Sequence, residues 1–119
     1  MKIKSYENLI VWQKSMNLVI LIYKLTKSFP KEELFGLVSQ VRRSAVSIPS
    51  NIAEGSRRSS RKDFKNFLFN AYGSGAELET QIKISKGLFY GKDSDYDSID
   101  GILEEVMKML NKLIHEIEE

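Results

Sequence analysis

Residues 99–117 of the chain read IDGILEEVMKMLNKLIHEI. Apolar side chains recur every three or four residues in this stretch, at Ile99, Leu103, Val106, Leu110, Leu113 and Ile117. This spacing puts all of them on one face of a helix, with charged side chains on the opposite face. The stretch therefore predicts an amphipathic helix that packs its apolar stripe against other elements of the fold.

The segment 8–28 forms the first predicted helix, with apolar residues at helical spacing in Leu9, Trp12, Met16, Val19 and Tyr23. Within it, the run 18–23 is apolar at every position. At about 100° per residue such a run covers the whole circumference of a helix, so one face needs a cover from outside the chain's own core. We therefore predict self-association, through an interface of Leu18, Leu21, Ile22 and Leu25.

The second helix is expected from the break at Phe29-Pro30 to about Gly55. Its apolar stripe is Leu34, Leu37 or Val38, Val41, Ala45, Ile48 and Ile52. Pro49 lies inside this helix, where it has no N–H to donate to the carbonyl of Ala45 and should cause a kink. Two shorter helices that meet at Pro49 are the alternative, but the stripe stays in phase across the proline and favours one kinked helix.

The third helix is expected to begin at Ser60, because Asp63 follows three residues later as in a capping box, and to end near 87–91. Its stripe is Phe64, Leu68, Ala71, Gly75, Leu78 and Ile82. Gly73 and Gly75 within it indicate a close approach of backbones. Caps for the fourth helix are available in Ser94, Asp95 and Asp97.

Four long helices with short connections predict an all-α fold: an antiparallel up-down four-helix bundle, kinked at Pro49 in its second helix. With 119 residues, the chain is expected to be a single domain, 1–119. No continuous apolar segment is long enough for a signal peptide or a membrane span, so a cytoplasmic protein without membrane contact is expected.

Residues with catalytic or metal-binding potential are sparse. The sequence has no cysteine and one histidine, His115, which beside Glu116 is either a metal ligand or, the preferred interpretation, a surface residue near a helix end. No HExxH motif, phosphate-binding glycine loop or nucleophile with a neighbouring base is present. We therefore expect no enzyme activity, no metal and no cofactor.

Basic residues are concentrated in the first half of the chain. Residues 1–65 contain 13 Lys and Arg against 5 Asp and Glu, whereas residues 66–119 contain 5 against 11. The basic residues around the turn between the second and third helices, with two from the second helix, form a predicted phosphate-binding site. Its members are Arg42, Arg43, Arg57, Arg58, Arg61, Lys62 and Lys65. A solvated charged turn is the alternative interpretation.

A second set of polar residues shares faces of the second and third helices. It consists of Gln40, Arg43, Asn51, Glu54, Ser74 and Glu77. We predict a half-buried polar network, in which Arg43 or a neighbour meets Glu54 or Glu77 and fixes the register of the helices. The alternative is an ordinary exposed face.

The segment 47–55, SIPSNIAEG, resembles the signature of the 23S rRNA intervening sequence protein family, also called four helix bundle proteins. The flanking motifs LxVWQ at 9–13, LxxQVRR at 37–43 and FLxxAxGSxxELE at 67–79 agree with it. The resemblance implies a four-helix bundle that assembles as a homopentameric ring, in a family encoded within bacterial 23S rRNA genes or elsewhere in genomes. It supplies no catalytic residues.

Two functions are compatible with the sequence and the resemblance. The first is a non-enzymatic oligomer that binds RNA or DNA through its basic surface, as the resemblance to accessory proteins of diversity-generating retroelements implies. The alternative is a scaffold or accessory subunit that docks a larger enzyme, such as a reverse transcriptase, without binding nucleic acid directly.

Overall fold

The computed structural model describes residues 5–117, which form four long α-helices and no β-strand. The helices are α1 (Ile10–Thr26), α2 (Leu37–Ser56), α3 (Arg61–Gly87) and α4 (Asp93–Glu116). Short 3-10 helices, η1 (Tyr6–Asn8) and η2 (Lys31–Glu33), precede α1 and α2. The all-helical class predicted from the sequence is therefore confirmed.

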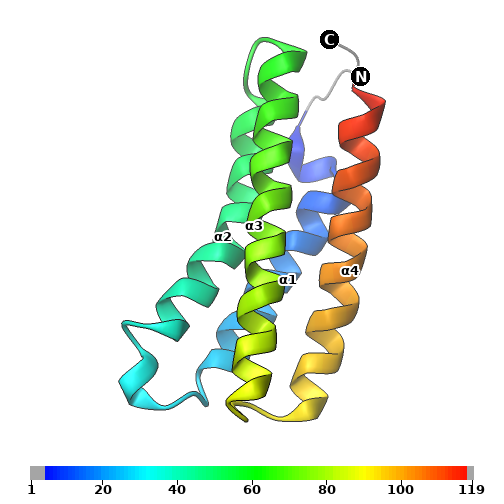
Figure 1. The fold of residues 1–119 in the computed structure, drawn as a ribbon. Coiled ribbons are helices and arrows are strands. Elements are labelled where there is room, and N and C mark those ends of the chain that lie inside the picture. Colours follow the sequence, from blue (N-terminus) through cyan, green and yellow to red (C-terminus); the bar gives the residue numbers. More distant parts are fainter. Residues whose placement is uncertain (1–4, 118–119) are drawn as a thin grey trace.

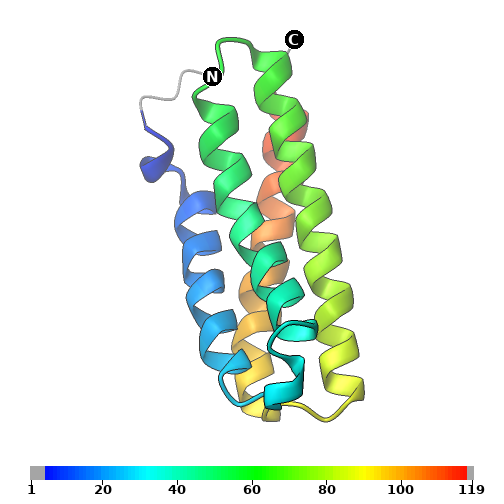
Figure 2. The same cartoon turned by 90° about the vertical axis from the view of Figure 1, so that its left-hand side faces the viewer.

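The four helices lie side by side, and successive helices run in opposite directions (Figure 1). The molecule measures 44 × 24 × 20 Å, and its long dimension follows the helix axes (Figure 2). We call the end that carries the α2–α3 connection the turn end. The opposite end, where the α1–α2 and α3–α4 connections lie, is the loop end (Figure 1).

The apolar core runs between all four helices, and the expected stripes of α3 and α4 lie in it. All of the apolar positions predicted for those two stripes are buried, Gly75 included. The stripe of α2 is confirmed from Val38 to Ile52. Leu34 was expected in that stripe, but it precedes α2 and its side chain is 49% exposed, so this position is wrong.

The phase predicted for α1 is wrong. Its buried stripe is Val11, Ser15, Leu18, Ile22 and Leu25. The run 18–23 carries no phase information, because every position in it is apolar. Ser15 also made the true stripe hard to recognise in the sequence, because serine is usually a surface residue. Here Ser15 is buried, and its hydroxyl donates a hydrogen bond to the carbonyl of Trp12 (2.8 Å) within the helix.

This phase corrects the predicted oligomer interface. Leu18 and Ile22 are fully buried in the chain's own core and Leu25 nearly so, which leaves none of the three available to a second copy. Only Leu21 is half-buried. The apolar surplus of α1 lies on another face instead, where Ile20 is 52% exposed and Tyr23 40% exposed.

The start of α2 also differs from the expectation. Residues 31–33 form a separate 3-10 helix, and α2 begins at Leu37 after Gly36, rather than at Pro30. From Leu37 the helix is continuous through Pro49, so the prediction of one helix rather than two is confirmed. A kink at Pro49 stays a prediction.

The helix starts agree with the sequence for α3 but not for α4. The Ser60 hydroxyl accepts a hydrogen bond from the backbone N–H of Asp63 (3.1 Å), as the capping motif predicts. In α4 the cap position is Lys92, and no side chain caps the helix. Asp93 and Asp95 lie within the first turn, where their charge suits the helix dipole without a capping bond.

The glycines of α3 differ in what surrounds them. Gly75 is buried, and a methyl group added there would collide with the thioether of Met107 from α4. Gly73 faces open space, so the expected close approach does not involve it. A second close helix contact involves Gly55 of α2, beside Phe64 and Phe67 of α3.

Within residues 5–117, no helix combines the length and the apolar character that a membrane span requires.

Candidate nucleic-acid interface

The turn end gathers five basic residues within nine positions. Arg57 and Arg58 lie in the α2–α3 connection, and the first two turns of α3 contribute Arg61, Lys62 and Lys65. Four of the five side chains are exposed and Lys65 is half-buried. Because the connection between α2 and α3 is only four residues long, 57–60, the charges within it and at the start of α3 are held at one end of the molecule. We call these five residues the basic turn.

Aromatic rings support the two arginines of the connection. The Arg57 guanidinium lies over the ring of Tyr6, 5.4 Å from its centroid, and the Arg58 guanidinium lies over Phe67 at 4.9 Å. Arg58 also pairs with Glu54 (2.7 Å), but both side chains are about half exposed, so the pair is weak. These contacts orient the planar groups and leave much of the positive charge facing solvent.

Arg42 and Arg43 do not join the basic turn. They lie about 20 Å from it along α2, at 1.5 Å per residue, so the predicted seven-residue site is not brought together. Arg42 is half-buried, its Nε donates to the Thr26 hydroxyl (2.9 Å), and its guanidinium lies 4.4 Å from the ring centroid of Tyr23. Arg42 therefore links α2 to α1 and is a structural residue.

The polar network between α2 and α3 forms with only part of the predicted membership. The Ser47 and Ser74 hydroxyls are hydrogen-bonded to each other (2.8 Å), and Asn51 Nδ2 donates to the carbonyl (2.8 Å) and the hydroxyl (2.9 Å) of Ser47. Ser44 donates to Glu77 Oε1 (2.7 Å). The predicted contact to Glu77 thus comes from the neighbour of Arg43.

The remaining members of that predicted network lie outside it. Gln40 and Arg43 are exposed, and Glu54 is engaged by Arg58. Ser44 was missed, although its position next to Ala45 in the α2 stripe marks a polar side chain that needs a buried partner. The network fixes α2 against α3 and so holds the basic turn that joins them.

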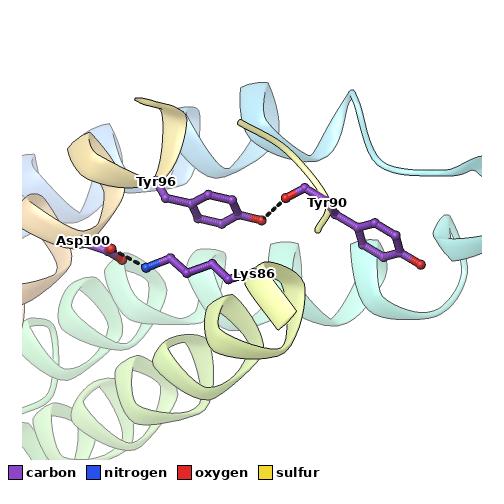
Figure 3. A network of polar contacts seen from close by, with 4 residues as sticks. All are labelled: Lys86, Tyr90, Tyr96 and Asp100. Atoms are coloured by element: carbon purple, nitrogen blue, oxygen red, sulfur yellow. Dashed lines mark hydrogen bonds and ion pairs between the residues drawn. The ribbon is translucent and has the colours of Figure 1, made fainter. Parts of the chain in front are cut away.

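A second set of polar contacts, not expected from the sequence, closes the loop end. The buried Tyr96 donates its hydroxyl to the carbonyl of Tyr90 (2.6 Å), and Lys86 pairs with Asp100 (2.5 Å) beside it (Figure 3). Tyr90 in turn donates to Glu33 Oε2 (3.0 Å), which ties the α3–α4 connection to η2. Together these contacts connect α3, α4 and η2 at the loop end.

The two tyrosines have raised pKa values. Burial raises the pKa of Tyr96, and the negative charge of Asp100 raises it further. The hydrogen bond to Glu33 is the largest cause of the raised pKa of Tyr90. In both cases the folded protein favours the neutral phenol.

Replacing Tyr96 by phenylalanine should lower the free energy of unfolding by about 1–2 kcal/mol at neutral pH, since the Tyr90 carbonyl loses its partner. A raised folded pKa stabilises the fold below the unfolded value of about 10, and this stabilisation is lost as the pH rises through the folded value. The variant should therefore lose less stability than the wild type between about pH 9 and 11.

Urea titrations across this pH range measure both effects, with Tyr72→Phe as the control, because Tyr72 is 37% exposed. Equal pH dependence in the wild type and the Tyr96 variant would contradict the prediction.

A metal centre has no support in this part of the chain. Among residues 5–117, no group of three or more His, Cys, Asp or Glu side chains is placed to hold a metal ion. His115 is exposed, and its Nδ1 lies 2.7 Å from the carbonyl oxygen of Asn111, within its own helix. The preferred interpretation of His115, a surface residue near a helix end, agrees with this position.

The fold and the basic turn define a small all-helical protein with clustered basic residues at the connection between α2 and α3. The chain belongs to the 23S rRNA-intervening sequence protein family, whose family model matches residues 7–112. This confirms the resemblance seen in the segment 47–55.

A solved structure supports the same assignment. It is the crystal structure of a protein with unknown function from the S23 ribosomal protein family of Bacteroides thetaiotaomicron, which superposes with a TM-score of 0.81 at 30% sequence identity. The match covers 88% of this chain and 98% of that one. No curated protein matches the chain.

Proposed function

We propose that this protein is a non-enzymatic, oligomeric up-down four-helix bundle of the bacterial cytoplasm that binds the backbone of RNA or DNA through its basic turn. The observation that carries the proposal is the concentration of five cations at the turn end, in the segment 57–65, whose one acidic residue is Asp63. Clustered Lys and Arg bind nucleic acid by releasing the counterions of its phosphates.

Two further features support phosphate contact at this end. The basic turn continues into the N-terminus of α3, where backbone N–H groups favour anions. The acidic residues are concentrated elsewhere in the molecule: α4 carries seven acidic residues against two lysines. A polyanion is therefore attracted to the turn end and repelled along α4.

Self-association, as the homopentamer that the family resemblance implies, would repeat the basic turn around a ring. Weak contacts made by each copy then add through multivalency. The exposed apolar side chains of α1, with Ile10 at 57% and Ile20 at 52%, support the presence of an interface between copies.

Reversing the charge of the basic turn in the variant R57E/R58E/R61E should abolish most of the binding of a fluorescent oligonucleotide. The slope of log affinity against log salt should flatten by about 2 units, at about 0.7 per lost phosphate contact on a single strand. Fluorescence anisotropy at several salt concentrations measures both quantities.

The matched control is K24E/K27E/K31E, which changes the charge equally at the loop end, on three exposed side chains. This control should bind with an unchanged salt slope. An unchanged slope in the turn-end variant would remove the proposal.

The second candidate is a scaffold or accessory subunit for a larger enzyme, such as a reverse transcriptase, without nucleic-acid binding of its own. It is favoured by Phe35 at the loop end, whose side chain is 94% exposed. Exposed aromatic side chains of this kind are common at protein interfaces. Under this candidate the wild type shows no salt-dependent affinity for free oligonucleotides, so the same anisotropy experiment separates the two functions.

A further inference from the structure

The connection after α3 places Phe89 in an unusual conformation. Its φ is +61°, in the left-handed region that bulky side chains rarely adopt. The N–H of Tyr90 donates to the carbonyl of Ser85 (3.1 Å) and the N–H of Phe89 to that of Lys86 (3.0 Å), which is the Schellman pattern. At the left-handed position of this motif glycine is the usual residue.

Packing within its own chain does not compensate for this conformation, because Phe89 is 91% exposed. Leu88 beside it is 47% exposed. An unfavourable backbone conformation and an unburied aromatic ring both act against the isolated fold. Such a residue indicates a contact with something outside the chain.

The α1–α2 face of the molecule has a groove of matching character. It holds about 470 Å³, its apolar walls include Tyr23, Val38 and Val46, and Phe35 lies at its rim. A second hollow continues it along α1 and α2 and shares Val46. We call the first of these hollows, the one that a single phenylalanine ring would enter, the α1–α2 groove.

The charges around Phe89 and the groove are complementary. Arg42 and Arg43 line the groove, and no acidic residue does. The segment 86–100, which carries Phe89, holds Asp93, Asp95, Asp97 and Asp100 against Lys86 and Lys92, so its net charge is negative. A net negative segment with an exposed apolar ring thus fits a basic rim around an apolar groove.

The two features lie toward the same end of the molecule. The α3–α4 connection, to which Phe89 belongs, is at the loop end (Figure 1), and the groove is lined by residues of the first half of α2, the half nearer that end, and by the residues just before it. A rotation about an axis parallel to the helices keeps each feature at its height. Such a rotation can bring Phe89 of one copy to the groove of the next.

We propose that Phe89 of one copy inserts into the α1–α2 groove of a second copy. The contact is heterologous, because each copy offers the ring from one surface and the groove from another, and repetition of it can close a ring. This inference rests on the self-association proposed above, and it assigns the residues that form the contact.

The variant Phe89→Gly tests the contact without harming the fold, since glycine is the residue that the Schellman motif accepts best. Sedimentation velocity should show its mass falling from that of the assembled wild type to 13.7 kDa, the mass of one chain. The groove variant Val46→Glu, at a position 39% exposed, should fall to the same mass. Circular dichroism should show unchanged helix content in both.

Mixing the two variants gives the sharpest test. The groove of the Phe89 variant and the ring of the Val46 variant are both intact, so an equimolar mixture at high concentration should form a dimer and nothing larger. Phe69→Ala is the matched control, as Phe69 is an aromatic residue 52% exposed in the first third of α3, and it should keep the wild-type mass.

The outcomes separate the two proposals. A wild-type protein that sediments as one chain at all concentrations would overturn self-association itself. An assembled wild type whose mass survives Phe89→Gly, or a mixture of the two variants that stays at the mass of one chain, would overturn only the insertion of Phe89. If the wild type assembles and the Phe89→Gly variant keeps the same mass, the exposed ring of Phe89 contacts a different partner.

Discussion

Replacing Leu110 by alanine should lower the free energy of unfolding by about 2–5 kcal/mol, which for a chain of this size is a large part of its stability. Leu110 lies in the last third of α4, and its side chain is fully buried within the core. The loss combines the hydrophobic transfer energy of the deleted carbons with the energy of the cavity left among rigid neighbours.

Urea denaturation measured by circular dichroism gives this difference directly. Leu34→Ala is the matched control, because the same carbons are deleted from a side chain that is 49% exposed, and it should change the stability by less than about 1 kcal/mol. Similar losses in both variants would mean that α4 does not hold its apolar stripe in the core.

Replacing Gly55 by alanine should cost about 2–3 kcal/mol, although it adds only a methyl group. That methyl carbon would lie 2.6 Å from Cβ of Phe67 and 3.3 Å from the carbonyl oxygen of Phe64, both close to the backbone of α3. Neither atom can rotate away, so α2 and α3 would have to separate next to the basic turn.

Gly73→Ala is the control for this substitution. Gly73 is exposed within α3 and has nothing within 4 Å of the added carbon, so alanine should stabilise the helix by up to about 1 kcal/mol. Opposite signs for the two glycines are expected in the same denaturation series. A neutral Gly55→Ala would show that α2 and α3 are not in close contact at this point.

The stripes of α3 and α4 could be predicted because each is narrow and has polar residues on both sides. The phase of α1 could not, since the run 18–23 is apolar throughout and the buried Ser15 resembles a surface residue. For the same reason the interface residues were misplaced. The sequence shows that α1 has more apolar side chains than one buried face can hold, but only the packing of the helices shows which of them are exposed.

The candidate site divides in the same way. The basic turn was predictable, because its members are neighbours in the sequence at a connection that must be exposed. The position of Arg42 away from the basic turn was not predictable, since its partners Tyr23 and Thr26 belong to another helix. The bond between Tyr90 and Glu33 spans 57 positions, and no local pattern predicts it.

The central claim, that the basic turn is the surface that meets nucleic acid, is tested most directly by locating the contact. Ultraviolet crosslinking of a bound oligonucleotide, followed by mass spectrometry of the digested chain, identifies the peptides that touch it. We expect crosslinked peptides from residues 57–67, with none from α4 before its last turn. Crosslinks confined to the loop end or to the acidic face of α4, or none at low salt, would contradict the account.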